Sequence, residues 1–227
     1  MYETNGIIFR WLGHDGFQLK KANIIIYIDP FKLTQTDLEK ADVIIATHQH
    51  GDHFSKDDII KLADSQKTTL ITIKQAEAQA KAINAKEVKI VKPGDSISLH
   101  NFTFEFVPAY NVNKFRDPKK GIPFHPKEDK HIGVIIDFEG TRVYHTGDSD
   151  HIPEMKTLKT DIALLPVSGT YVMTADEAVE AVESLKMTSD LKLAIPMHYG
   201  AGVVGDESMA QAFKEKADCK VVILKKE

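Results

Sequence analysis

The chain has 227 residues, of which 42% are hydrophobic and 27% charged, the balance of a globular protein with a substantial core. Its formal net charge of -4 argues against a general nucleic-acid binder, which would carry an excess of basic residues. The single cysteine, Cys219, excludes an intrachain disulfide and suits a reducing compartment. Without a secretory leader or an apolar run near ~18 residues, we expect one cytoplasmic domain over residues 1–227 with no membrane span.

The first half of the chain alternates strands with helices. Short β-branched runs predict strands at residues 7–12, 16–19, 23–29, 43–47, 69–73 and 88–91. Ser55, with Asp58 three residues later, predicts a helix that begins with a capping-box variant. An alanine-rich segment predicts a second helix at residues 74–84.

The second half continues the alternation after a hairpin at residues 96–109, which should turn at His100 and Asn101. A long polar loop is expected at residues 110–130. Later strands are predicted at 132–138, 141–146, 161–167, 191–198 and 219–224, and helical segments at 152–158, 174–186 and 206–217. Thr174 with Glu177 predicts a capping box. This order indicates helices packed outside one or two sheets, an α/β protein.

Residues 47–54 read THQHGDHF, which places His48, His50, Asp52 and His53 within six positions. Neutral histidine and ionised aspartate are preferred ligands of Zn, Mn and Fe. In extended backbone His48 and His50 point to the same side, so both can reach one ion. Asp52 and His53 follow Gly51, where the chain can turn, and can face a second ion.

Two further candidate ligands follow later strands. Asp148 comes after the strand TRVYHT, and His198 comes after LKLAIP. The carboxyl ends of strands are where open sheets place their ligand sites. Each position alone is a weak signal, but together with the histidine cluster they support one metal centre.

The segments HQHGDH, HTGDSD and IPMHYG, with WLGHDGF and YIDPF, resemble the metal-dependent hydrolases of the metallo-β-lactamase superfamily. The resemblance covers about residues 11–199 and is greatest to the branch that includes ascorbate 6-phosphate lactonase and related phosphodiesterases. It implies a four-layer αββα sandwich with a dinuclear site. By that resemblance His48 and His50 bind the first metal, Asp52, His53 and His198 the second, and Asp148 bridges the two.

One position departs from the family pattern. The family usually has a third histidine for the first metal after the strand FTFEFVPA, where this chain has Asn111. An amide oxygen is a weaker ligand for such ions than imidazole. His125, on the following loop, is our preferred substitute, with His131 as the alternative; an ordinary loop histidine is the competing interpretation of His125.

Two other residues are expected beside the metals. The resemblance places His14 on an early hairpin near the site, where it would contact substrate or metal; a structural histidine is an equally supported interpretation. Asp29, at a strand end, suits the role of an outer partner that orients a metal-binding histidine. Asp52 or Asp148 would orient the attacking water and manage its proton, with His14 beside them.

The loop at residues 113–130 carries six Lys or Arg against three acids and is therefore net positive in a net negative chain. Such a loop beside a metal site could hold a phosphate, and Lys114 and Arg116 are the predicted contacts. Asn111 and His125 are also expected to face substrate. The competing interpretation is a loop that is charged only for solubility.

These observations predict an enzyme that uses metal-activated water on a small anionic ester, phosphodiester or lactone. One or two divalent ions are expected, with zinc as first choice and manganese, nickel or iron as alternatives. The competing hypothesis is a metal-binding but catalytically silent module, motivated by Asn111. Redox use of a di-iron site is less favoured because no flavin-binding domain is recognised. Self-association into a homo-oligomer stays open.

Overall fold

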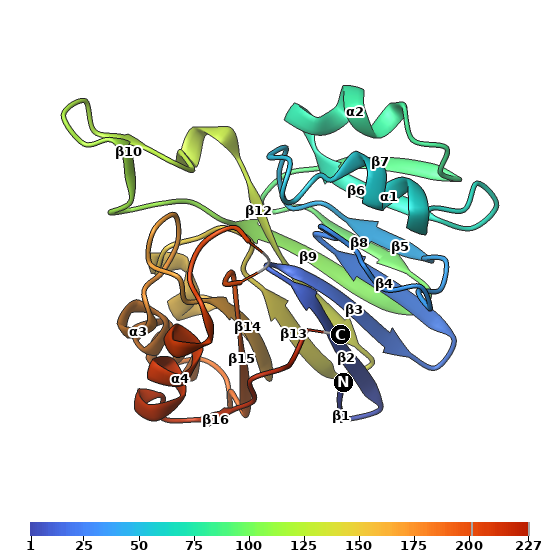
Figure 1. Cartoon of the computed structure of the whole chain (residues 1–227). Coiled ribbons are helices and arrows are strands. Elements are labelled where there is room, and N and C mark those ends of the chain that lie inside the picture. Colours follow the sequence, from blue (N-terminus) through green and yellow to red (C-terminus); the bar gives the residue numbers. More distant parts are fainter. Residues whose placement is uncertain (201, 227) are drawn as a thin grey trace. The chain divides into compact units, whose positions relative to one another are not determined.

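The computed structural model describes residues 1–200 and 202–226, and its contacts divide the chain into two compact units. Unit 1 comprises Met1–Lys92 and the end of the chain from Leu224, and unit 2 comprises Pro93–Ile223. Each unit has its own seven-stranded sheet and its own helices (Figure 1). The α/β class expected from the sequence is therefore observed. The expectation of one domain stays a prediction, and each unit is described by itself.

The sheet of unit 1 has the strand order β1-β2-β3-β4-β5-β6-β7. Neighbours are antiparallel from β1 to β4 and parallel from β4 to β7. Its strands are β1 (Tyr2–Thr4), β2 (Ile7–Gly13), β3 (Gly16–Lys21), β4 (Ile24–Ile28), β5 (Val43–Ile45), β6 (Thr69–Ile73) and β7 (Glu87–Val91). Parallel neighbours need crossover connections, and helices α1 (Lys56–Leu62) and α2 (Glu77–Lys81) lie in two of them.

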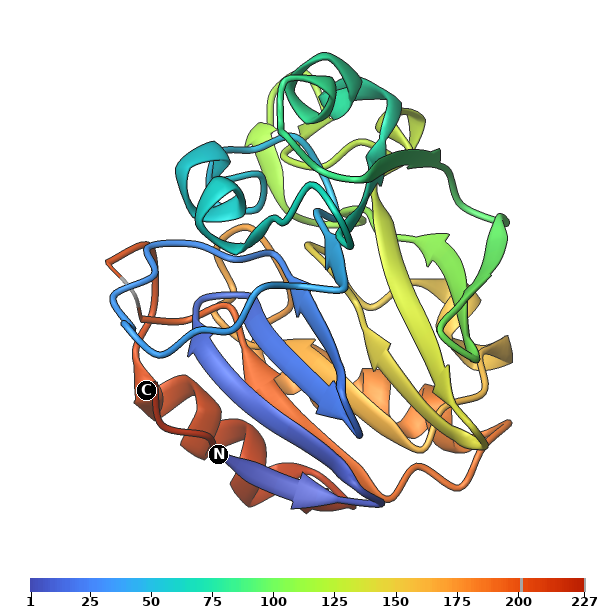
Figure 2. The same ribbon diagram turned by 90° about the vertical axis from the view of Figure 1, so that its right-hand side faces the viewer.

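The core of unit 1 includes an apolar cluster that joins α1 and α2 to the sheet. Ile59 and Leu62 of α1 and Ala80 of α2 are fully or almost fully buried in it, together with Tyr27 and Leu70 of the strands. The two helices lie beside each other, next to β6 and β7, in both views (Figures 1 and 2). Burial of these side chains, at about 25 cal/mol per Å² of apolar surface, holds the helices against the sheet.

Two local predictions for unit 1 are wrong. Ser55 makes no side-chain cap to the backbone of α1; its hydroxyl donates to Asp58 Oδ2 at 2.8 Å instead. Asp58 Oδ1 accepts from Lys61 Nζ and from the backbone N–H of Leu33, so its carboxylate is already engaged and no capping box forms. The helix expected at 74–84 is shorter, because a 3-10 turn, η1 (Lys74–Ala76), precedes α2.

The large sheet of unit 2 has the order β16-β15-β14-β13-β12-β9-β8. Neighbours are antiparallel from β8 to β13 and parallel from β13 to β16. Its strands are β8 (Ser96–Leu99), β9 (Phe102–Pro108), β12 (Ile132–Phe138), β13 (Thr141–His145), β14 (Ile162–Pro166), β15 (Leu193–Met197) and β16 (Lys220–Val221). The last strand is shorter than expected.

Helices α3 (Ala175–Lys186) and α4 (Glu207–Lys216) contact each other and pack against β14 and β15 respectively, as Figure 1 shows. The capping box of α3 is confirmed: Thr174 Oγ1 accepts from the Glu177 N–H, and the Glu177 carboxylate accepts from the Thr174 N–H. The expected hairpin turn is also confirmed, since His100 and Asn101 both have positive φ, as a tight two-residue turn requires.

The segment expected as a polar loop at 110–130 contains regular structure. It forms a small hairpin of β10 (Phe115–Asp117) and β11 (Ile122–Pro123), followed by a 3-10 turn, η2 (Lys127–Asp129). The helical segment expected at 152–158 is the 3-10 helix η3 (Pro153–Thr157). Among the described residues, none of the helices has the length and hydropathy needed to cross a bilayer.

Candidate metal centre

In unit 1 the loop after β5 carries His48, His50, Asp52 and His53, which we call the contiguous set. β4 and β5 are parallel neighbours, so their carboxyl ends meet at the same edge of the sheet. Asp29 is the first residue after β4, and its N–H donates to Ile45 O at 2.9 Å. The parallel pairing therefore places Asp29 next to the start of the loop that carries the contiguous set.

Asp29 orients this loop through its buried carboxylate. Its oxygens accept hydrogen bonds from the N–H of Thr47 at 2.8 Å and from Thr47 Oγ1 at 2.6 Å. Asp29 Oδ2 also lies 2.8 Å from His53 Nδ1. A carboxylate only accepts, so His53 carries a proton on Nδ1 and presents the lone pair of Nε2. This carboxylate–histidine arrangement is the one that fixes metal-binding imidazoles, and it agrees with the role predicted for Asp29.

His48 and His50 converge in the same loop. Thr47 Oγ1 gives its only proton to Asp29, so toward His48 Nδ1, at 3.1 Å, it acts as acceptor. His48 therefore presents its Nε2 lone pair, which lies 3.0 Å from His50 Nδ1. Two nitrogen ligands of one tetrahedral zinc ion would be about 3.3 Å apart. The two rings thus fit the first-metal pair that the sequence predicts.

Asp52 and His14 lie together in unit 1, with Asp52 Oδ2 3.3 Å from His14 Nε2. His14 is fully buried, and its carbonyl oxygen accepts from Trp11 Nε1 at 2.9 Å. The sequence did not single out its neighbour Asp15, which is also fully buried and has Oδ2 3.9 Å from His53 Nδ1. The hairpin that carries His14 therefore supplies two polar side chains next to the contiguous set.

In unit 2 three candidate ligands come from separate segments: His125, Asp148 and His198, which we call the dispersed set. Asp148 follows β13 and His198 follows β15, two strands that run parallel in the sheet through β14. β9 runs in the same direction as β13, because both are antiparallel to β12. The loop after β9, which carries His125, therefore starts at the same sheet edge.

Asp148 lies between two imidazoles. Its Oδ2 is 3.2 Å from His125 Nε2 and 3.3 Å from His198 Nε2, and all three residues are at most 3% exposed. The other ring nitrogen of His198, Nδ1, lies 2.8 Å from Ser168 Oγ. Within unit 2, one oxygen of Asp148 therefore has a histidine nitrogen on each side, and its role as a bridging ligand stays a prediction.

The side chain of Asn111 is buried and contacts His125. Asn111 Oδ1 accepts from the His125 N–H at 2.8 Å and lies 3.1 Å from His125 Nδ1. Asn111 Nδ2 donates to Tyr171 O at 2.8 Å. The amide at the position of the missing family histidine is thus bonded to the histidine we predicted as its substitute.

Backbone strain coincides with these residues. His14, Asp29 and His198 are non-glycine residues with φ of +54°, +46° and +59°, a conformation that costs about 1–3 kcal/mol each when the surroundings impose it. His14 lies in the two-residue turn between β2 and β3, as His100 and Asn101 lie in the turn between β8 and β9. Asp29 and His198 directly follow β4 and β15, and backbone strain of this kind is common at functional sites.

The remaining histidines divide into buried and peripheral ones. His131 is buried at the start of β12, and its ring centroid is 5.6 Å from that of His125. His145 Nδ1 accepts from the Gly147 N–H at 3.1 Å and so supports the turn before Asp148. His100 is exposed in its hairpin turn, as expected. His151 is half-buried, with Nε2 2.8 Å from Ser184 Oγ.

The two predicted phosphate contacts differ in their surroundings. Lys114 Nζ donates to both carboxylate oxygens of Glu177 and lies 3.7 Å from Asp150 Oδ1. Burial raises the pKa of Glu177, but hydrogen bonds from Lys114, the Thr174 backbone and Asn113 bring it down to about 2. Lys114 therefore ties the loop to the start of α3. Arg116, on β10, is exposed.

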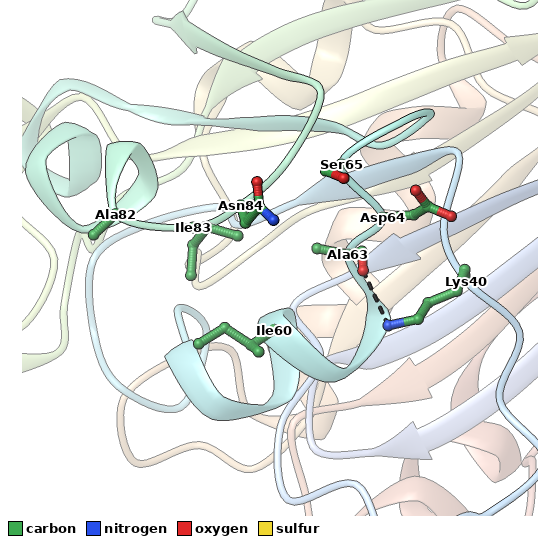
Figure 3. Close-up of a pocket in the computed structure, with 8 residues that line it drawn as sticks. All are labelled: Lys40, Ile60, Ala63, Asp64, Ser65, Ala82, Ile83 and Asn84. Atoms are coloured by element: carbon green, nitrogen blue, oxygen red, sulfur yellow. Dashed lines mark hydrogen bonds between the residues drawn. The ribbon is translucent and has the colours of Figure 1, made fainter.

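A pocket of about 450 Å³ in unit 1 contains none of these residues. Figure 3 shows that it lies beside α1 and the segment that follows α2, with Lys40 reaching Ala63 at the end of α1. Lys40 Nζ donates to Lys61 O at 2.7 Å and Ala63 O at 3.0 Å. Lysine commonly satisfies the last carbonyls of a helix in this way, so Lys40 caps the end of α1.

Residues 9–198 match the family model described as a β-lactamase superfamily domain. The chain belongs to this family. It is 31% identical to a UPF0173 metal-dependent hydrolase of Archaeoglobus fulgidus, over 95% of this chain and 94% of the relative. It is 30% identical to one of Thermus thermophilus, over 91% of each chain.

The solved structures agree with the family match. The crystal structure titled as a putative metal-dependent hydrolase from Parabacteroides distasonis has a TM-score of 0.77 and 31% identity, over 96% of this chain and 92% of that one. The metallo-β-lactamase fold expected from the sequence is therefore confirmed. The chain is a member of the UPF0173 family of metal-dependent hydrolases, and the narrower lactonase branch stays a prediction.

Sequence reasoning missed the outer partners other than Asp29. Thr47, Ser168 and Asp15 contact candidate ligands, yet nothing in their local sequence distinguishes them from other buried polar residues. Position supplied the only available signal: Thr47 directly precedes His48, and Ser168 follows β14 at the same sheet edge as Asp148. The orienting contact of Asn111 was also missed, because Asn111 was considered only as a ligand or a substrate contact.

Proposed function

We propose that this chain is a hydrolase of small anionic substrates, namely phosphodiesters, lactones or other esters, that works with one or two divalent metal ions. Zinc is the first choice, with manganese, nickel and iron as alternatives. Family resemblance implies that the ligands are His48, His50, Asp52, His53, Asp148 and His198. The single cysteine supports a reducing, cytoplasmic setting.

One observation carries the proposal: in both sets, an oxygen atom lies within hydrogen-bond distance of a histidine Nδ1. The other ring nitrogen, Nε2, is then the atom that can bind a metal ion. The oxygen is Thr47 Oγ1 for His48, Asp29 Oδ2 for His53, Ser168 Oγ for His198 and Asn111 Oδ1 for His125. Outer partners of this kind fix the tautomer that a metal needs. Neutral imidazoles next to carboxylates are also the donor set that zinc, manganese and iron prefer, so the residues fit the ion.

When bound, the ions would lower the pKa of water and polarise the bond it attacks. The chain's own residues then have distinct roles. Asp52, which is only partly buried, takes the proton of the attacking water, and His14 Nε2, 3.3 Å from its Oδ2, orients that carboxylate. Asp148 would be a further metal ligand, as the family resemblance implies. A general base of this kind contributes about 10²–10⁴-fold to the rate.

The loop after β9 would supply the contacts to an anionic substrate. Arg116 is the primary candidate, because it is exposed and its guanidinium can bind two oxygens of a phosphate or carboxylate. Lys114 contributes less, because the Glu177 carboxylate offsets its charge. Asn111 and His125 lie at the start and the end of the same hairpin loop.

Activity after chelation and reconstitution tests the function. Purified protein should be stripped with a chelator, reloaded separately with Zn²⁺, Mn²⁺, Ni²⁺ or Fe²⁺, and assayed on bis(p-nitrophenyl) phosphate and a panel of lactones and esters. We expect hydrolysis only in the reloaded samples. An Arg116→Ala variant should raise KM for anionic substrates by about tenfold and leave neutral ester hydrolysis unchanged.

The silent-module hypothesis gives a different result in the same assay. It predicts that metal binds but that no substrate in the panel turns over with any of the four ions. Binding of less than one ion per chain by every metal would instead contradict both functions, since both require an occupied site.

A further inference from the structure

We propose that the side chains of Tyr171 and Phe124 form an aromatic platform beside His198, and that this platform selects substrates that carry an aryl group. The inference rests on the proposed function, because it assumes that substrate is hydrolysed at a metal ion bound by His198. It deepens that function by narrowing the substrate class to anions with an aryl group next to the phosphate or carboxylate. All contacts used below lie within unit 2.

Tyr171 lies on the loop between β14 and α3, and this loop is closed by its own hydrogen bonds. The Gly169 N–H donates to Met173 O at 2.9 Å, and Ser168 pairs with Thr174 in an antiparallel bridge. Gly169 has a φ of +77°, and a Cβ there would lie 3.0 Å from Thr174 Cγ2, so the tight closure requires glycine. Tyr171 is therefore carried by a loop with a fixed backbone.

The loop after β9 holds Tyr171 from a second side. Asn111 Nδ2 donates to Tyr171 O at 2.8 Å. Further along the same loop, the ring of Phe124 lies against that of Tyr171, with centroids 4.8 Å apart and planes at 86°. Aromatic rings favour this edge-to-face arrangement. The Phe124 N–H donates to Lys114 O at 3.2 Å, so both rings are positioned before any substrate binds.

The ring of Tyr171 lies next to a predicted metal ligand. The ring centroids of Tyr171 and His198 are 6.5 Å apart, with planes at 61°. His198 Nδ1 lies 2.8 Å from the hydroxyl of Ser168, which belongs to the same loop as Tyr171. One loop therefore orients the histidine and supplies an aromatic ring beside it. A substrate whose anionic group reached an ion on His198 would have its neighbouring group near Tyr171.

Exposure distinguishes the two rings from the core aromatics of the same unit. Tyr171 and Phe124 are half-buried, whereas Phe104 and Phe106 of β9 are at most 1% exposed. Accessible aromatic surface beside a polar centre is typical of a site that binds the apolar part of a ligand. Ring faces are partly negative and ring edges partly positive, so an aryl group gains a contact that a saturated ring lacks. The fixed rings also lose little freedom on binding. These properties fit an aryl group better than an alkyl group.

Binding of three phosphonates to the zinc-reconstituted protein tests the platform without relying on turnover. Methyl-, cyclohexyl- and phenylphosphonate share one anionic group, and the last two carry rings of similar size. In isothermal titration calorimetry we expect wild type to bind phenylphosphonate about three- to tenfold more tightly than cyclohexylphosphonate. Tyr171→Leu should lose this preference, Tyr171→Phe should retain it, and Phe124→Leu should reduce it by about twofold.

Phe115→Leu is the matched control, because it removes a phenylalanine from the same hairpin. Phe115 pairs with Pro123, the residue before Phe124, and successive residues of a strand point to opposite faces. This variant should bind all three phosphonates as wild type does. Zinc content and thermal unfolding of every variant show whether a substitution disturbs His198 or the fold. If Tyr171→Leu fails to fold, Tyr171→Phe and Phe124→Leu decide the question.

Two results would overturn the platform: wild type that binds phenyl- and cyclohexylphosphonate equally, or a Tyr171→Leu variant that binds all three phosphonates more weakly by the same factor. The second result would mean that Tyr171 only supports the loop that holds His198. Zinc-loaded wild type that hydrolyses no phosphodiester, lactone or ester would contradict the proposed function itself, which is a separate outcome.

Discussion

The contiguous and the dispersed sets are built in different ways. In unit 1, His48, His50, Asp52 and His53 lie in one short loop. The carboxylate of Asp29 accepts hydrogen bonds from Thr47 and His53 of that loop. In unit 2, His125, Asp148 and His198 come from three loops, and each of the two histidines has its own partner, Asn111 or Ser168. The members of the contiguous set are close together because they are neighbours in the chain. The members of the dispersed set are close together because the strands before them end at the same edge of the sheet.

This difference implies different sensitivities. Loss of Asp29 should disturb several members of the contiguous set together, because its two oxygens receive Thr47 and His53. Loss of one partner in unit 2 should disturb only the histidine it holds. Substitutions can therefore test the comparison directly, and the predictions below run from the largest expected effect to the smallest.

Removal of a contiguous-set ligand should have the largest effect. We expect His48→Ala to lower kcat/KM by about 10³-fold or more, because an ion contributes several kcal/mol to the stabilisation of the transition state. The measurement is steady-state kinetics on whichever substrate the reloaded wild type hydrolyses. His100→Asn is the control, since His100 is exposed and asparagine tolerates its positive φ. Equal activity in both variants would show that His48 is not a ligand.

Asp29→Asn should come next, with metal affinity reduced about 10–100-fold. The amide retains the shape of the carboxylate but presents a donor where Asp29 Oδ2 now receives Thr47 and His53. Competition with a chromophoric chelator measures the affinity of each site. Asp37→Asn, which changes an exposed carboxylate paired with the buried Arg10, should leave both sites unchanged. If only one histidine of the loop responded to Asp29→Asn, the contrast between the two sets would be broken.

Glu177→Gln should affect unit 2 alone. The pKa of Glu177 is lower when folded, about 2, than its ordinary 4.5, so its charge stabilises the fold above pH 4.5. That stabilisation is lost as pH falls from about 4.5 to about 2. After allowance for solvent screening we expect Glu177→Gln to cost about 1–2 kcal/mol at pH 7.

Urea unfolding of wild type and Glu177→Gln at several pH values measures this difference. The two curves should converge toward pH 2, and the exposed Glu183→Gln should follow the wild type throughout. A difference that stayed constant from pH 7 to pH 2 would mean that the lost interaction is not ionic.

Ser168→Ala should have the smallest effect, a reduction of about two- to tenfold in the affinity of one metal site. The hydroxyl holds only His198 Nδ1, and water can replace it. Ser189→Ala, whose hydroxyl donates to Leu185 O, is the control. A loss as large as that of Asp29→Asn would mean that single partners in unit 2 matter as much as the shared carboxylate in unit 1.

The sequence was sufficient to predict the contiguous set because its members are neighbours in the chain. The ring nitrogens of His48 and His50 lie 3.0 Å apart, as predicted, although the chain bends after β5 at these residues and does not continue as the expected strand. Asp148 and His198 could be predicted as strand-end residues, since parallel strands bring their carboxyl ends to one edge. The capping box at Thr174 was equally visible, as it involves residues only three positions apart.

What the sequence could not give was the set of contacts made across long separations. The bond between Asn111 and His125 depends on the fold of the β10–β11 hairpin between them, and no periodicity predicts that closure. Ser168 reaches His198 thirty positions away. The capping box at Ser55 failed for a similar reason, because the Leu33 N–H, far away in sequence, binds the Asp58 carboxylate that the local pattern assigned to the helix.

Metal stoichiometry of His48→Ala and His198→Ala, compared with wild type after reconstitution with Zn²⁺, tests the central claim most directly, since one substitution removes a ligand from each set. The account predicts one or two ions per chain in wild type and fewer in either variant. An unchanged number of tightly bound ions in either variant, or less than one in the wild type, would contradict it.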